Sequence, residues 1–84
     1  MTYKVEENNN TCIVHLNGEI DMEVADKARQ TILPLIKEGK IIQVNLSKVE
    51  YMDSSGISVL IESKQLAEKN SAKFELTEVS KPVE

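Results

Sequence analysis

Apolar and polar residues alternate along three stretches of the chain, and this two-residue period predicts β-strands. The stretches cover residues 3–7, 12–17 and 73–77. The asparagine triplet at 8–10 separates the first two, and it predicts a turn because Asn tolerates left-handed backbone angles. Residues 3–17 are therefore expected to form a β-hairpin, whose second strand ends at Gly18.

A first helix is expected after this hairpin, because apolar residues then recur at helical spacing up to Ile36. Asp21 is a suitable N-cap residue. Lys37 is expected in the last turn, and Gly39 is expected just after the C-cap. Pro34 predicts that the helix either kinks or loosens in its last turn, because proline cannot donate a backbone hydrogen bond.

The most strand-like stretch is 41–46, whose apolar composition is typical of a central strand. Residues 47–52 lead from it into a second helix, which is expected to begin at 53–56, to run to about Lys69 and to stop at 70–71. The apolar face expected for this helix is formed by Ile57, Leu60, Ile61 and Ala67.

Strands that alternate with helices predict an α/β fold, with a central mixed, mostly parallel sheet and helices packed on it. At 84 residues the chain is expected to form one small domain, 1–84. Residues 79–84 resemble the start of a further helix, so we expect a domain truncated at its C-terminus. A missing helix would leave an apolar patch of the sheet uncovered, and a homodimer is one way to cover it.

Charge and composition exclude several classes of function. Ten basic and fourteen acidic residues give a net charge of −4, which argues against a nucleic-acid partner and against attraction to anionic membranes. No apolar run is long enough to span a membrane, and the N-terminus does not resemble a signal peptide, so we expect a cytoplasmic protein without membrane insertion. With no Trp and 4% aromatic residues, the chain is not expected to form an aromatic-lined ligand pocket.

Enzyme chemistry is not expected, because no pair of nucleophile and base stands out. His15 lies on a predicted strand without a carboxylate or serine near it in sequence, and Cys12 is expected to be a buried, unreactive thiol. These two residues are three apart on one strand, so they point to opposite faces and do not suggest a metal site. No glycine-rich phosphate loop is present, and no cofactor is expected.

The segment Asp53-Ser54-Ser55-Gly56 follows a predicted buried strand and opens a helix, and it has two interpretations. In the structural one, which the residue types alone favour, Asp53 or Ser54 caps the helix and Gly56 allows a tight turn. In the functional one, the exposed hydroxyl of Ser54 accepts a phosphate, which the helix dipole and free N–H groups accommodate.

A phosphate at this position would act through charge. It adds about −1.5 to −2 charge units. Beside Asp53, and with Glu19 and Asp21 expected nearby, it would concentrate negative charge on one surface. A partner protein docked there would be repelled, so the segment has the properties of a binary switch.

The same segment carries a resemblance to a known family. Residues 51–57, Tyr-Met-Asp-Ser-Ser-Gly-Ile, resemble the signature of STAS domains, the anti-sigma factor antagonists of bacteria. Further similarity lies in Gly18-Glu19-Ile20-Asp21, in the stretches 32–35 and 44–46, and in 76–83. The resemblance covers essentially the whole chain.

The resemblance implies that the protein is a kinase substrate and binding protein rather than an enzyme. In the family, the first serine after the aspartate, here Ser54, is phosphorylated by a serine kinase that is itself the anti-sigma factor. The unphosphorylated antagonist binds this kinase and frees a sigma factor, and a phosphatase is a further expected partner. The implied partner-binding residues are Glu19, Asp21, Asp53, Ser54, Ser55, Gly56 and Ile57.

Two departures leave an alternative open. Family members usually continue through another helix and often a further strand. Residues 56–62 also resemble a subset that includes accessory subunits of a phospholipid ABC transporter, which dock on the ATPase without a need for serine phosphorylation. The alternative function is therefore that of such a docking subunit.

Overall fold

A computed structural model describes residues 3–78 of the chain. The elements succeed one another as β1 (Lys4–Asn8), β2 (Thr11–Ile20), α1 (Met22–Ile32), the 3-10 turn η1 (Leu33–Leu35), β3 (Ile41–Met52), α2 (Ser54–Lys69) and β4 (Lys73–Thr77). This order confirms the predicted succession of strands and helices. The predicted helix start at 79–84 lies outside the described residues.

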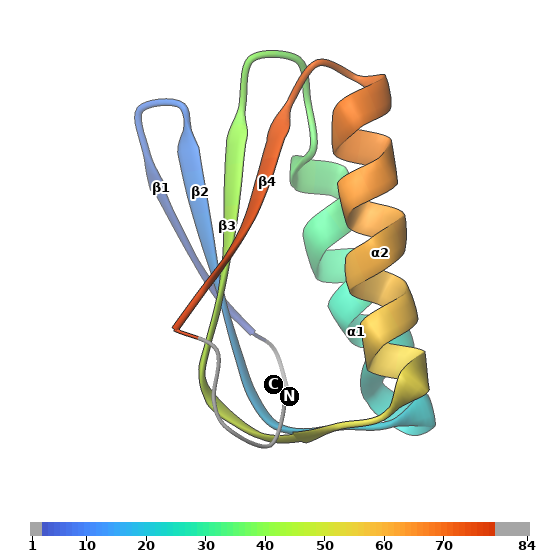
Figure 1. The fold of residues 1–84 in the computed structure, drawn as a ribbon. Helices are drawn as coiled ribbons and strands as arrows, with labels where there is room; N and C mark the ends of the chain where they lie inside the picture. The colour runs from blue at the N-terminus through green and yellow to red at the C-terminus, as the bar shows by residue number, and fades with distance from the viewer. Residues whose placement is uncertain (1–2, 79–84) are drawn as a thin grey trace.

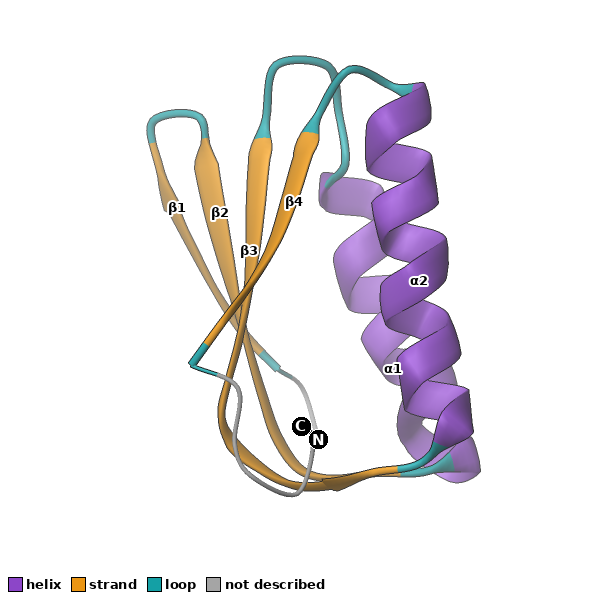
Figure 2. Ribbon diagram, in the orientation of Figure 1, coloured by secondary structure: helices purple, strands orange, loops and turns teal. Residues whose placement is uncertain are grey.

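The four strands form one sheet in the order β1-β2-β3-β4. β1 pairs with β2 antiparallel, as the predicted hairpin requires, whereas β2–β3 and β3–β4 are parallel pairs. Both helices lie on the same face of this sheet, so the molecule has two layers (Figures 1 and 2). The predicted α/β class with a mixed, mostly parallel sheet is confirmed.

The hydrophobic core lies between the sheet and the two helices. Alternate residues of β2 and β3 point into it, which is the period expected of strands with one buried face. The largest fully buried apolar side chains are those of Leu16, Ile20, Ile32, Ile42 and Leu46. Branched aliphatic side chains therefore supply most of the apolar burial that stabilises the fold.

The end of α1 shows one of the two outcomes expected from Pro34. The α-helix stops at Ile32, and Pro34 lies in the 3-10 turn directly after it. Ile36 is already extended, with ψ 104°, so the prediction that Lys37 belongs to the last helical turn is wrong. Gly39 has φ +80°, but it lies in the turn before β3 and not directly after the helix C-cap.

Two strands are longer than predicted. Gly18 does not end β2: it adopts φ +72° within the strand, which continues to Ile20. The register between β2 and β3 shifts on both sides of Asn17-Gly18, and β3 runs on to Met52. In Figure 1 the extended ends of both strands curve beneath the helices and lead directly into them.

The predicted apolar face of α2 is partly wrong. Ile57 and Ile61 are 44% and 53% exposed, whereas Val59 and Ser63 are buried. The Ser63 hydroxyl donates a 2.7 Å hydrogen bond to the carbonyl oxygen of Val59, so its burial leaves no polar atom unsatisfied. The helix is thus rotated relative to the expected orientation, and two isoleucines face outwards.

Candidate functional site

The parallel strands β2 and β3 end side by side, at one edge of the sheet. Ile20 is in register with Met52, and the backbone N–H of Asp53 donates to the carbonyl oxygen of Ile20 at 3.2 Å. Asp21 and Asp53 each come directly after one of these strands, so the structure brings both predicted acidic residues to the same edge. Polar residues that come after neighbouring parallel strands are well placed to form a site.

Each of these aspartates caps the helix that it precedes. The Asp21 carboxylate accepts hydrogen bonds from the backbone N–H groups of Glu23 at 3.0 Å and Val24 at 3.3 Å. The Asp53 carboxylate accepts from Ser55 at 2.9 Å and Gly56 at 3.3 Å. Of the two predicted capping residues of α2, the structure therefore selects Asp53, and Ser54 is left free of that role.

Ser54 is the first residue of α2 and is exposed to solvent. Within residues 3–78 its hydroxyl makes no hydrogen bond, whereas the backbone groups around it are engaged by Asp53. We call residues 53–56 the α2 tip. At this tip Ser54 offers an accessible hydroxyl group, which is the property that a modified serine requires.

The expectation about free N–H groups needs a correction. The N–H groups of Ser55 and Gly56 are occupied by the Asp53 carboxylate, and the N–H of Ile57 donates to the Asp53 carbonyl oxygen at 3.1 Å. A phosphate on Ser54 would therefore meet a carboxylate where free donors were expected. The helix dipole still favours a negative charge at this end of α2.

Gly56 is buried against the ends of both parallel strands. A Cβ atom added at this position would lie 2.6 Å from Cγ of Met52 and 2.9 Å from Cγ2 of Ile20, and 3.1 Å from the Ile20 carbonyl oxygen. The glycine is thus required by close packing, and not by the tight turn that the sequence suggested. It lets the α2 tip lie directly on the core.

Ser55 is half-buried and lines a hollow of about 330 Å³ between α1 and α2. The hollow is also lined by Met22, Ala25, Asp26, Arg29, Ser58 and Val59. Arg29 of α1 and Glu62 of α2 form an ion pair at 3.1 Å that links the two helices. The α2 tip is therefore continuous with a surface to which both helices contribute.

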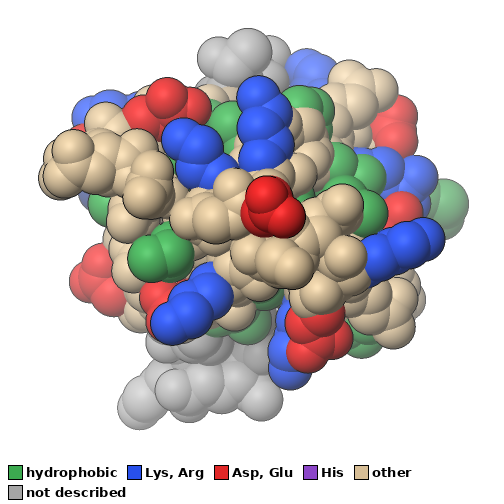
Figure 3. Space-filling view, turned by 90° about the horizontal axis from the view of Figure 1, so that it is seen from above, with side chains coloured by type: hydrophobic (Ala, Val, Ile, Leu, Met, Phe, Trp, Pro, Cys, Tyr) green, Lys and Arg blue, Asp and Glu red, His purple; other side chains and the backbone are tan. Residues whose placement is uncertain are grey.

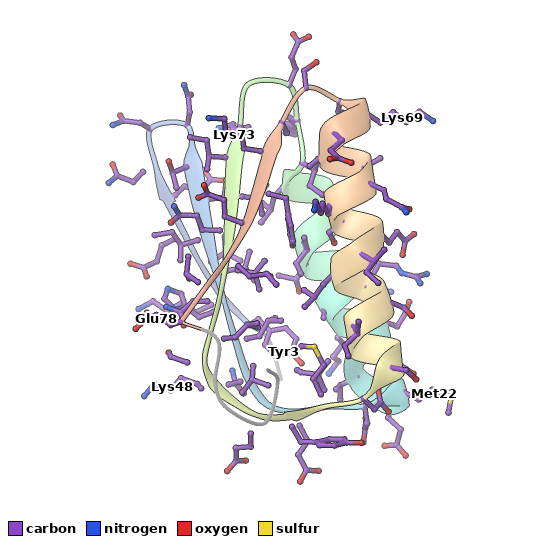
Figure 4. All side chains as sticks on the ribbon, viewed as in Figure 1. Tyr3, Met22, Lys48, Lys69, Lys73 and Glu78 are labelled. Atoms are coloured by element: carbon purple, nitrogen blue, oxygen red, sulfur yellow. The ribbon has the colours of Figure 1, made fainter. Side chains whose placement is uncertain are left out.

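Sequence reasoning missed Met22, which is 77% exposed beside this hollow. Figure 4 shows it pointing away from the molecule at the end that carries the α2 tip, with Lys69 at the far end of α2. A flexible thioether suits an adaptable contact surface. The available signal was a large apolar residue at the first position after a helix cap, where the side chain has little to pack against.

Two predicted site residues lie apart from the others. Glu19 is exposed and lines a small hollow of about 100 Å³ with Tyr3, Gly18 and Val24. Burial, with the Asp21 carboxylate adding to it, raises the pKa of Tyr3 above its ordinary value. Ile57 faces a groove beside β4, on the side of α2 away from Met22.

The end of the molecule away from the α2 tip has a mainly polar and charged surface. Figure 3 looks down on that end, where Lys and Arg side chains alternate with Asp and Glu and hydrophobic side chains form only small, separate areas.

No helix within residues 3–78 has the length and apolar character needed to cross a membrane. Among the same residues, no three His, Cys, Asp or Glu side chains are grouped so that they can hold a metal ion.

Cys12 and His15 point to opposite faces of β2, as predicted. Cys12 is 1% exposed, and burial together with the nearby Glu7 carboxylate raises the pKa of its thiol. His15 has a carboxylate partner that is distant in sequence, because β1 places Glu6 within hydrogen-bond distance of its Nε2 atom. This pair lies on the exposed face of the hairpin, away from the α2 tip.

Comparisons with known proteins agree with the geometry. A family model described as "STAS domain" matches residues 2–84. The anti-sigma-B factor antagonist of Bacillus subtilis is 32% identical over 76 residues, which are 90% of this chain and 70% of that protein. The anti-sigma-B factor antagonist of Listeria monocytogenes is 35% identical over 49 residues, which are 57% of this chain and 43% of that protein.

A solved structure gives the same result at the level of the fold. The anti-sigma factor antagonist SpoIIAA, in its unphosphorylated form, superposes with a TM-score of 0.80 at 25% identity. The match covers 98% of this chain and 74% of that one. The fold and the sequence therefore point to the same group of proteins.

Proposed function

The chain belongs to the STAS domain family, and from this premise we propose that it acts as an anti-sigma factor antagonist that is switched by phosphorylation of Ser54. The unphosphorylated form binds an anti-sigma factor that is also a serine kinase, and a sigma factor is thereby released. Phosphorylation of Ser54 by that kinase ends the binding, and a phosphatase restores it. The domain itself performs no catalysis.

The observation that carries this proposal is the state of the Ser54 hydroxyl. It is exposed at the first position of α2 and makes no hydrogen bond within the described residues. The neighbouring residue Ser55 is half-buried in the hollow between the helices, so a kinase has easier access to Ser54. This difference supports Ser54 as the phosphorylated residue.

The switch works through electrostatics at the α2 tip. The Asp53 carboxylate already occupies the N–H groups of Ser55 and Gly56, so it lies directly beside Ser54. Asp21 caps the adjacent helix at the same edge of the sheet. A phosphate adds about two negative charges to this group, which disfavours any partner surface that accommodates the unmodified tip.

The partner surface comprises the α2 tip and the neighbouring acidic residues. The predicted binding residues are Glu19, Asp21, Asp53, Ser54, Ser55, Gly56 and Ile57, and the structure adds Met22 as an exposed apolar contact. An apolar side chain next to a rim of carboxylates is a common arrangement in protein interfaces. We expect the kinase to present a basic or hydrogen-bond-donating surface to this tip.

The experiment is a capture from lysate of the source organism with four baits, namely the natural chain, Ser54→Ala, Ser54→Asp and Ser71→Asp. Ser71 is exposed just beyond the far end of α2, so its substitution is a control for added charge away from the α2 tip. We expect a protein with a kinase-type ATP-binding domain to be retained by the natural chain, Ser54→Ala and Ser71→Asp, and to be lost with Ser54→Asp. Equal capture of transporter ATPase or permease subunits by all four would refute the proposal in favour of a docking subunit.

A further inference from the structure

The sulfur atoms within residues 3–78 belong to Cys12, Met22 and Met52, and these side chains differ greatly in exposure. Cys12 is 1% exposed and Met52 is 6% exposed, whereas Met22 is 77% exposed. Burial, with the Glu7 carboxylate adding to it, also raises the pKa of the Cys12 thiol, which favours the less reactive protonated form. An oxidant that arrives from solvent therefore meets the Met22 thioether first.

The position of Met22 in α1 explains its exposure. A side chain in a helix leans back over the preceding turn, and Met22 has no such turn because it is the first residue of α1. The junction is held by the Asp21 cap, which engages the backbone N–H groups of Glu23 and Val24. Figure 4 shows the Met22 side chain pointing away from the molecule. The fold therefore makes little use of this thioether.

Met52 has the opposite environment. It ends β3 and packs against the α2 tip so closely that a Cβ atom added to Gly56 would lie 2.6 Å from its Cγ. Oxygen added to this side chain has no room without displacement of the tip. The two methionines of the described chain thus differ in access to solvent and in their contribution to packing.

Met22 also adjoins the proposed partner surface. It lines the hollow of about 330 Å³ to which Ser55 of the α2 tip contributes. The residues that line this hollow belong to α1 and α2 alone, and it lies on the side of α2 away from β4. Met22 and Ser54 are the first residues of their helices, which follow strand ends that are in register. A change at Met22 is therefore made beside the switch residue.

We propose that Met22 is a site of reversible methionine oxidation, and that its sulfoxide weakens the binding of the partner at the α2 tip. This inference rests on the proposed function. The oxidant is a peroxide, which transfers one oxygen atom to the thioether sulfur. The S–O bond forms as the O–O bond breaks, the sulfur loses two electrons, and hydrogen peroxide leaves as water.

The sulfoxide acts on binding because it changes the polarity of the contact. Oxidation converts a flexible apolar side chain into a polar one. A partner surface that accommodates the thioether must then remove water from the sulfoxide oxygen without replacing its hydrogen bonds, which is unfavourable. Phosphorylation adds charge at the start of α2, whereas oxidation adds a dipole at the start of α1. The same surface thereby receives a second chemical input.

Reduction makes this input reversible. Methionine sulfoxide reductases, one for each sulfoxide epimer, restore the thioether. Two thiols supply the two electrons and become a disulfide, and the oxygen atom leaves as water. The exposure of Met22 gives a reductase the same access as the oxidant.

The first part of the test identifies the oxidised residue and needs no partner. The natural chain and Met22→Leu are treated with dilute hydrogen peroxide, which catalase then removes, and peptide mass spectrometry follows each methionine. Oxidation at Met22 is expected to be about tenfold or more faster than at Met52. Met22→Leu retains Met1 and Met52, so it is the matched control for oxidation elsewhere. Equal rates at Met22 and Met52, or a lower melting temperature of the chain oxidised at Met22, would overturn the proposal.

The second part measures affinity for the captured kinase by titration calorimetry. The oxidised natural chain is expected to bind about fivefold or more weakly, and treatment with both reductases should restore its affinity. Met22→Leu should bind within about twofold of the natural chain before and after peroxide, because it conserves apolar volume. Met22→Gln, which is polar without oxidation, should bind as weakly as the sulfoxide.

Equal affinity of the natural chain before and after oxidation would overturn the inference. The proposed function is scored separately, by the loss of binding in unoxidised Ser54→Asp. Binding that resists Ser54→Asp but falls on oxidation of Met22 would refute the phosphorylation switch alone. Binding that is lost in Ser54→Asp but indifferent to oxidation would refute the role of Met22 alone.

Discussion

The two strand-to-helix junctions of this domain, β2 to α1 and β3 to α2, share the same cap but differ in the residues that follow it. Each has an aspartate after a parallel strand, and each aspartate accepts from the second and third N–H groups of its helix, at 3.0 and 3.3 Å for Asp21 and 2.9 and 3.3 Å for Asp53. The third helical residue is Val24 in α1 but Gly56 in α2. Capping is therefore a common requirement of both junctions, and the residues after the cap make the junctions different.

The difference lies in how closely each helix approaches the core and in what it exposes. α1 begins with the exposed Met22, and its Val24 is only half-buried. α2 begins with Ser54, and its Gly56 packs against Ile20 and Met52. The glycine allows the second junction to sit tightly on the core, while the serine before it stays accessible. Structural need explains the aspartates and the glycine, but it does not explain an exposed hydroxyl at Ser54.

The largest effect is expected from Gly56→Val, which gives the second junction the residue type of the first. The added side chain overlaps Met52 and Ile20, so the free energy of unfolding should fall by about 3 kcal/mol. Val24→Ala, the matched change in α1, should cost about 1 kcal/mol. Urea unfolding of both variants measures this, and an unchanged stability of Gly56→Val would contradict the packing assigned to the glycine.

Removal of the caps should affect the two junctions equally. Asp21→Ala and Asp53→Ala each release two backbone N–H groups, so each should lower the free energy of unfolding by about 1 kcal/mol. The Asn variants should retain most of the stability, because Asn also accepts at the N-cap. Thermal unfolding of the four variants measures this. A several-fold larger loss at one junction would show that the two caps are not equivalent.

Met22 and Ser54 occupy the same position in their helices, and Met22→Ser tests whether the α1 junction contributes to binding. The side chain is 77% exposed, so stability should change by no more than about 0.5 kcal/mol. Affinity for the captured kinase should fall about fivefold or more, the loss typical of a truncated interface residue. Titration calorimetry measures the affinity of both forms. Unchanged affinity would confine the contact surface to α2.

Tyr3 lies at the first junction and has no counterpart at the second. Burial and then Asp21 raise the pKa of its phenol above the ordinary 10.0, so the neutral form is favoured in the folded state. The contribution of Tyr3 to the free energy of unfolding is therefore present below pH 10. It is lost as the pH rises above that value, because the phenol ionises at a lower pH in the unfolded chain than in the folded one. Alkaline stability curves should fall less steeply for Tyr3→Phe than for the natural chain. If the two proteins lose stability identically as the pH rises, groups other than Tyr3 cause the loss.

Much of this architecture could be predicted from the sequence, because its signals are local. The alternating stretches, the asparagine turn and Asp21 each determine nearby backbone, and all of them led to the correct elements. Pro34 likewise predicted where α1 loosens. The failures concern position relative to distant parts of the chain. Gly18 looked like a strand end, yet β2 continues through it with a shift in register against β3.

The same limit applies to α2 and to the candidate site. Ile57 and Ile61 were predicted to be buried because they are apolar, but the helix turns them towards the groove beside β4. Helical periodicity gives the spacing of a face and not the direction in which it points. At the α2 tip, the residues were identified from the sequence, whereas the role of Gly56 and the occupied N–H groups required coordinates.

The most direct test of the account is to locate the phosphate. The natural chain and Ser54→Ala are incubated with the captured kinase and ATP, and the modified residue is identified by peptide mass spectrometry. We expect a single phosphate on Ser54 in the natural chain and none in Ser54→Ala, because Ser55 is half-buried beside the Asp53 cap. A phosphate on Ser55 or Ser58, or no phosphate on the natural chain, would contradict the claim that the exposed hydroxyl of Ser54 is the switch.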